Sequence, residues 1–151
     1  ALALVVDAAN RTGGAPVRLA DPARAGAIFL STEELEQITR VVAEALTNAR
    51  RHAAASRIAV SVARRGKEMN VTVADDGRGF SPDPQAASQA GHFGLNIMQA
   101  RAARMGGRLA IDAAPGAGTR ITLTWQVAEE ATGTKASFPV TEQAEIQGVA
   151  P

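Results

Sequence analysis

The strongest constraint on the fold is a two-residue alternation of apolar and polar side chains in four short segments. Residues 57–62 and 68–75 are joined by the turn sequence RRGKE, and residues 108–112 and 119–127 by AAPGAG. Successive side chains of a strand point to opposite faces, so each segment has one apolar face, and the short connections predict two hairpins. Strands of this kind predict an α+β two-layer sandwich, in which helices cover one face of a mixed, mostly antiparallel sheet.

Three segments carry helical signals, and the longest is STEELEQITRVVAEALTNARRHAAAS, which begins at Ser31. Ser31 or Thr32 is predicted to cap its N-terminus, where the helix dipole favours the acidic residues that follow. Its apolar stripe at helical spacing is Leu35, Ile38, Val42, Ala45, Leu46 and Ala49. Shorter helices are predicted over residues 1–12 and 94–107, and a brief strand over residues 15–20.

The remaining segments have little to bury. Residues 21–30 are expected to be irregular, with Ile28–Leu30 extended, and GFSPDPQAASQAGHFG (residues 79–94) is expected to form a mobile loop. From Ala128 onward apolar residues are few and show no period. The sequence therefore predicts one domain over residues 1–127 and a disordered tail over residues 128–151.

Composition excludes several classes of protein. The 151 residues carry a net charge of +1, which gives no basic face for nucleic acid, and no cysteine, which rules out disulfides and thiolate metal sites. No apolar run approaches the ~18–20 residues that cross a bilayer. The first residue is Ala1 rather than Met, and we expect a fragment of a longer protein.

Asp75 breaks the apolar pattern, because the alternation of its strand puts it on the same face as Val71 and Val73. A carboxylate directed at a core is costly without a partner. Thr119 falls on the inward face of the last strand. Both side chains could therefore form the polar base of a pocket that suits a flat ligand with an amine donor, such as adenine. The alternative is that Asp75 caps neighbouring amides in an Asp-Gly turn.

One face of the long helix gathers Glu44, Asn48, Arg51 and His52. In isolation this is a solvated face. Oxygen ligands beside a cation also suit Mg²⁺ and a phosphate chain. The loop that ends near Gly94 leads into a helix whose free amides attract anions, although a glycine there can simply mark the helix entry.

Four motifs occur in a fixed order along the chain: EALTNARRH, DDGRGF, GHFGL and GAGT. Together they resemble the ATP-binding domain of sensor histidine kinases. These domains have the Bergerat fold of the GHKL superfamily, which also holds DNA gyrase, MutL proteins and heat-shock chaperone ATPases. The resemblance covers about residues 1–127 and is greatest to the nitrate/nitrite sensors.

The resemblance implies ATP and Mg²⁺ as cofactors and assigns roles to matching positions. Asn48 matches the Mg²⁺ ligand. Glu44, one turn earlier, matches a catalytic carboxylate that positions metal-bound water or accepts a proton. Asp75 matches the aspartate that accepts a hydrogen bond from the adenine amine. The other positions implied to contact the nucleotide are Arg51, His52, Gly77, Gly79, Gly91, Gly94, Leu95 and Thr119.

The implied activity is transfer of the γ-phosphoryl group of ATP to a histidine on a dimerisation domain of the same protein. The implied partner after that is a response regulator. The dimerisation domain is absent here, and His52 and His92 lie outside any acceptor motif. The fragment is therefore expected not to autophosphorylate alone, and residues 81–93 to order when nucleotide binds. The resemblance implies a cytoplasmic domain without nucleic-acid or membrane contact, from a protein that can be anchored in the inner membrane. A serine kinase of the anti-sigma type and a non-catalytic nucleotide-binding module stay open as alternatives.

Overall fold

The described part of the chain folds into one sheet covered by helices on one side. The computed structural model describes residues 2–20, 30–81 and 93–127. Within these residues five strands pair in the order β1-β2-β3-β5-β4. The strands are β1 Val17–Ala20, β2 Ile58–Arg65, β3 Glu68–Asp75, β4 Arg108–Ala113 and β5 Thr119–Gln126. β1 pairs with β2 in parallel, and the other pairs are antiparallel.

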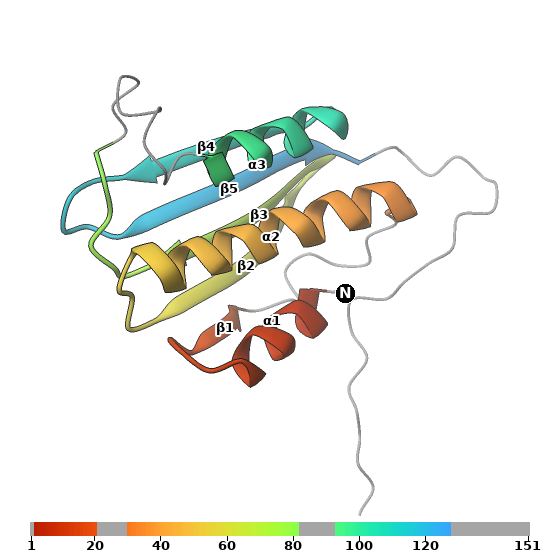
Figure 1. The fold of residues 1–151 in the computed structure, drawn as a ribbon. Coiled ribbons are helices and arrows are strands. Elements are labelled where there is room, and N and C mark those ends of the chain that lie inside the picture. Colours follow the sequence, from red (N-terminus) through yellow and green to blue (C-terminus); the bar gives the residue numbers. More distant parts are fainter. Residues whose placement is uncertain (1, 21–29, 82–92, 128–151) are drawn as a thin grey trace, which may run out of the picture.

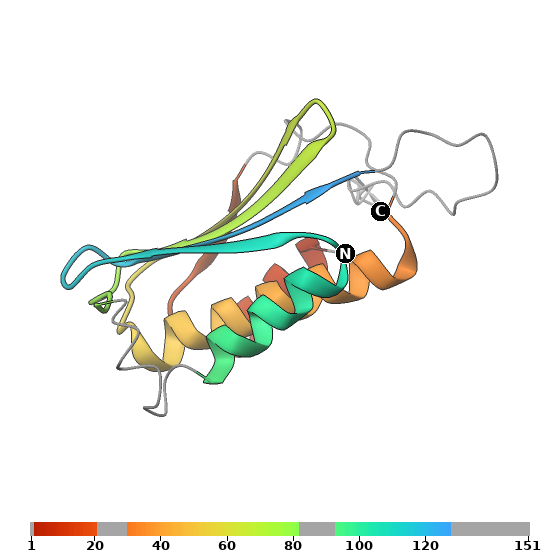
Figure 2. The same ribbon diagram turned by 90° about the horizontal axis from the view of Figure 1, so that it is seen from above.

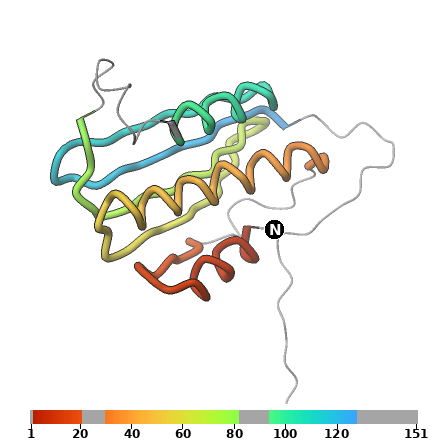
Figure 3. The backbone as a smooth tube through the Cα atoms, in the orientation of Figure 1, coloured from red at the N-terminus to blue at the C-terminus, as the bar shows by residue number. Residues whose placement is uncertain are grey.

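The three helices of the described residues form the second layer. They are α1 Leu2–Arg11, α2 Thr32–His52 and α3 Phe93–Arg104. Figure 1 shows α2 between α1 and α3, and Figure 2, turned by 90°, shows all three on the same side of the sheet. The predicted two-layer α+β sandwich with a mostly antiparallel sheet is confirmed, and the tube in Figure 3 traces both hairpins.

The inward residues of the strands make the core with α2 and α3, as the alternation predicted. The buried strand residues include Ile58, Val60, Val62, Met69, Val71, Val73, Ile121, Leu123 and Trp125. On α2 the buried arc is wider than the predicted stripe, because it also includes Gln37 and Val41, while Leu35 is only partly buried. The cause is the central place of α2, which packs against the sheet, α1 and α3 at once.

A capping box fixes the start of α2. The Ser31 hydroxyl accepts a hydrogen bond from the Glu34 N–H at 3.2 Å, and the Glu34 carboxylate accepts one from the Ser31 N–H at 2.6 Å. Ser31, rather than Thr32, is therefore the N-cap. At the other end of α2, Arg50 donates to the carbonyl oxygens of Ala9 and Ala15, which ties α1 to α2.

Several expectations concern residues outside the described ranges: extended backbone at Ile28 and Phe29, residues 82–92 of the predicted mobile loop, among them Gly91 and His92, and the tail from Ala128. In the ranges that are described, no helix is long and apolar enough to cross a membrane.

Candidate functional site

A cavity of about 510 Å³ lies between the C-terminal half of α2 and the ends of β3 and β5, within the size range typical of ligand pockets. Six residues predicted from the sequence line it: Asn48, His52, Asp75, Gly79, Leu95 and Thr119. The remaining lining residues are Ala45, Ala49, Ala53, Arg78, Phe80 and Ile121. The two hairpins and the two helices thus bring together four separate stretches of sequence at one hollow.

Asp75 ends β3 with its side chain on the covered face. It is paired in register with Thr119 of β5 and Ile58 of β2, which fixes its place at the edge of the core. The half-buried Asp75 carboxylate accepts a hydrogen bond from the Gly77 N–H at 2.9 Å. The turn cap and the inward acid, which the sequence offered as alternatives, therefore coexist in one side chain.

Burial dominates the electrostatics of Asp75. Loss of water around the carboxylate raises its pKa, while hydrogen bonds from the backbone N–H groups of Gly77 and Thr119 oppose the rise and the negative charge of Asp76 adds to it. An ionised carboxylate has about four acceptor positions. Two backbone donors leave capacity for a donor from a ligand in the cavity.

The loop after Asp75 is held between two neighbours. The N–H of Arg78 donates to the Ala53 carbonyl oxygen at 2.7 Å, and the Arg78 carbonyl oxygen accepts from Gly116 at 2.6 Å. A Cβ at Gly77 would collide with the backbone of Ala53, which explains why glycine is needed there. Gly77 itself does not line the cavity; it lets the loop approach the end of α2.

The first turn of α3 meets the side chains of α2. A Cβ on Gly94 would collide with the Glu44 carboxylate and lie 3.2 Å from Asn48 Nδ2. Glu44 and Asn48 are therefore side by side at the start of α3, although Glu44 does not line the cavity.

Asn48 Nδ2 is buried without a hydrogen-bond partner in the part of the chain that the structure describes. Of the three side-chain atoms in this condition there, the other two being Arg50 Nε and Trp125 Nε1, it alone belongs to a residue that lines the cavity. Buried polar groups are usually satisfied, so an unpaired amide here fits a ligand group. The amide is also of the oxygen-bearing type that Mg²⁺ accepts. Among the described residues there is no group of three or more His, Cys, Asp or Glu that could hold a metal ion.

Arg51 lies apart from the other predicted site residues. It is exposed and lines a broader groove of about 1200 Å³ between α1 and α2. His52, the next residue, lines the cavity. Helical spacing predicted that Arg51 and His52 share a face, but the two side chains fall on different sides of α2.

Three alanines, which we call the alanine wall of the cavity, are not among the site residues predicted from the sequence. Ala45, Ala49 and Ala53 line the cavity at intervals of four residues, on the side of α2 that faces the end of the sheet. The first two were assigned to the core stripe alone. A row of the smallest apolar side chains opposite an inward acid was the available signal, because small residues leave space where larger ones would fill it.

Comparisons with known proteins identify the family of the chain. The profile of the family described as "Histidine kinase-, DNA gyrase B-, and HSP90-like ATPase" matches residues 33–129. The nitrate/nitrite sensor protein NarQ of Escherichia coli is 36% identical over 103 residues, which are 68% of this chain and 18% of NarQ. The sensor histidine kinase LiaS of Bacillus subtilis is 34% identical over 98 residues, 65% of this chain and 26% of LiaS. The chain thus spans about a quarter or less of these relatives.

Solved structures give the same result for the fold. The histidine kinase domain of the blue-light activated histidine kinase of Erythrobacter litoralis EL346 has a TM-score of 0.66 and 25% identity, covering 82% of this chain and 58% of that one. The ATP-binding domain of PrrB from Mycobacterium tuberculosis has a TM-score of 0.67 and 19% identity, covering 83% and 90%. At that identity the second likeness shows the fold alone.

Proposed function

We propose that this chain, which belongs to the family of histidine kinase-, DNA gyrase B- and HSP90-like ATPases, binds Mg-ATP in the cavity beside α2 and supplies the γ-phosphoryl group to a histidine. The observation that carries the proposal is Asp75, a half-buried carboxylate with spare acceptor capacity at the floor of that cavity. The adenine amine is a donor of matching chemistry.

The base and the phosphates would lie at different ends of the site. Asp75 accepts a hydrogen bond from the adenine amine, with Thr119 beside it and the alanine wall of α2 against the base. The triphosphate extends toward Asn48 and the start of α3, where free N–H groups favour negative charge. The nucleotide would thus bridge the sheet and both helices.

Magnesium, when bound, neutralises part of the charge of the phosphates during transfer. Asn48 would hold it through the amide oxygen. Glu44, adjacent to Asn48, accepts either the proton of the attacking histidine or a hydrogen bond from a water beside the phosphates. His52, at the cavity, contacts the nucleotide. Positioning and charge neutralisation do most of the catalytic work in phosphoryl transfer.

The proposed partners are supported by the relatives, a sensor histidine kinase and a nitrate/nitrite sensor protein, which are both longer than this chain. We infer that the acceptor histidine lies on a dimerisation domain of the same protein and that a response regulator receives the phosphoryl group next. The domain would work in the cytoplasm, where ATP and response regulators are found.

Titration calorimetry tests the binding step. The chain should bind ATP more tightly than GTP, which has an oxygen in place of the amine, and more tightly with Mg²⁺ than with a chelator. Equal affinity for ATP and GTP, or no binding, would refute the proposal.

The transfer step needs the full-length protein, incubated with ATP labelled at the γ-phosphate. Label that is lost in acid but stable in base indicates phosphohistidine and supports the proposal. Acid-stable label on a serine would favour a serine kinase instead.

A further inference from the structure

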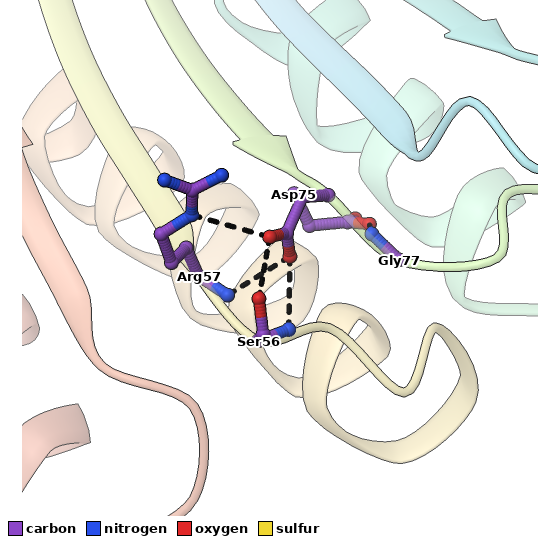
Figure 4. Close-up of polar contacts among 5 residues, drawn as sticks. Ser56, Arg57, Asp75 and Gly77 are labelled. Carbon is purple, nitrogen blue, oxygen red and sulfur yellow. Dashed lines mark hydrogen bonds and ion pairs between the residues drawn. The ribbon is translucent and has the colours of Figure 1, made fainter.

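Asp76 directly follows Asp75, and its carboxylate is fully occupied by two neighbouring residues. One oxygen accepts the backbone N–H groups of Ser56 and Arg57 at 2.8 and 2.9 Å. The other accepts the Ser56 hydroxyl at 2.6 Å and Arg57 Nε at 3.3 Å. The dashed lines of Figure 4 mark these contacts around the labelled Ser56 and Arg57.

These contacts join the end of β3 to the connection between α2 and β2. Ser56 and Arg57 lie between the C-cap of α2 at Ala53 and the first residue of β2, Ile58. The Asp76 N–H also donates to the Arg57 carbonyl oxygen at 3.3 Å. We call Asp76, Ser56 and Arg57 the β3 clamp.

The β3 clamp can affect the cavity because residues close to it in the chain line the cavity. Asp75 is bonded to Asp76 in the chain, and Ala53 stands three residues before Ser56. A shift of the connection by a few tenths of an ångström would move the carboxylate of Asp75 relative to the wall of α2. Hydrogen bonds weaken steeply when their geometry is poor.

We propose that Asp76 is a positioning residue of the nucleotide site, which acts through Asp75 and sets the selectivity for adenine. The inference rests on the proposed function, because it assumes that Asp75 accepts the adenine amine. It assigns to the second acid of DDGRGF a role separate from that of the first.

Two other accounts of Asp76 give different expectations. If Asp76 only stabilised the fold, its loss would reduce the folded fraction and leave the base preference of folded molecules intact. If it acted only by charge, its loss would favour the ionised form of Asp75, since the Asp76 charge raises the pKa of Asp75. The charge account therefore does not predict a weaker preference for adenine. Positioning alone predicts that the preference falls.

The test compares ATP with purine riboside triphosphate, which lacks the exocyclic amine, by titration calorimetry at neutral pH. The ratio of the two affinities reports the hydrogen bond to Asp75. In Asp76→Ala this ratio should fall at least about tenfold, the loss of one hydrogen bond to a charged group. Asp76→Asn should keep most of it, because the remaining carbonyl oxygen can still accept both backbone N–H groups.

Glu36→Gln is the matched control. It removes one exposed acid, which pairs with Arg40 at 2.8 Å on α2 outside the cavity, and should leave the ratio unchanged. If Asp76→Ala does not fold, the double variant Ser56→Ala with Arg57→Ala removes both side-chain donors and should lower the ratio by a smaller factor.

The outcomes separate the two claims. If Asp75→Asn lowers the ratio but neither Asp76→Ala nor the double variant does, the positioning role is wrong and the proposed function stands. If the wild type itself shows no preference for ATP, the proposed function fails and the inference fails with it.

Discussion

Two neighbouring carboxylates at the end of β3, those of Asp75 and Asp76, lie in opposite environments. Asp75, on the covered side, has two backbone donors and a pKa raised by burial. Asp76, which faces the connection between α2 and β2, has four donors, and these hydrogen bonds lower its pKa. Asp76, whose acceptor positions are occupied by neighbouring residues, has a structural role. Asp75, which keeps spare acceptor capacity in a cavity, is available to a ligand.

The largest expected effect concerns Asp75, the acid that lines the cavity. Replacing Asp75 by Asn removes the charged acceptor and should weaken ATP binding by ~1.5–3 kcal/mol. Titration calorimetry measures it, with Asp112→Asn, an exposed acid of β4, as the control for loss of one charge. Unchanged affinity in Asp75→Asn would remove Asp75 from the site.

The loop that carries both acids should be intolerant of a side chain at Gly77. Because a Cβ there would collide with backbone rather than with a movable side chain, Gly77→Ala should lower the free energy of unfolding by about 1–3 kcal/mol. Urea denaturation followed by circular dichroism measures this. Wild-type stability in the variant would mean that the loop is not packed against Ala53.

A third prediction concerns Asn48, which lines the cavity with Asp75 and whose amide oxygen is the proposed ligand of Mg²⁺. Asn48→Ala should lose the gain in ATP affinity that Mg²⁺ gives, by about 1.5 kcal/mol. Calorimetry with and without Mg²⁺ tests this. The same Mg²⁺ enhancement in variant and wild type would exclude Asn48 as the ligand.

The smallest expected effect is a difference in acid sensitivity. A carboxyl whose pKa is lowered by folding stabilises the fold fully above its unfolded pKa of about 3.9, and this contribution is lost as the pH falls below that value. The stability advantage of the wild type over Asp76→Asn should therefore shrink between pH 5 and pH 3.

Asp75 should show the opposite sign. Its pKa is raised in the folded state, so its ionisation costs stability above the folded pKa, and the cost disappears as the pH falls. Urea denaturation across this range, on the wild type and both Asn variants, compares the two acids directly. Parallel pH profiles for Asp75→Asn and Asp76→Asn would contradict the contrast between them.

Sequence periodicity was enough to place Asp75. The alternation of β3 and β5 put Asp75 and Thr119 on the inward face, and the hairpin registers then paired them. These features depend on neighbours along the chain, which is why local pattern captured them. The same holds for the N-cap at Ser31, whose partner Glu34 is three residues away.

The β3 clamp and the place of Arg51 could not be predicted in this way. Asp76 meets Ser56 across 20 residues of sequence, and no local period links an aspartate in a turn to a serine before a different strand. Arg51 and His52 occupy adjacent helix positions, and their separation depends on α1 packing along one side of α2. Both features follow from tertiary packing rather than from the pattern of any one segment.

The most direct test of the central claim is a crystal structure of this chain with Mg²⁺ and a non-hydrolysable ATP analogue. We predict the exocyclic nitrogen of adenine about 2.7–3.2 Å from a carboxylate oxygen of Asp75, in the cavity beside the alanine wall. Adenine bound elsewhere, for example in the groove between α1 and α2, or in the cavity with its amine turned away from Asp75, would contradict the account.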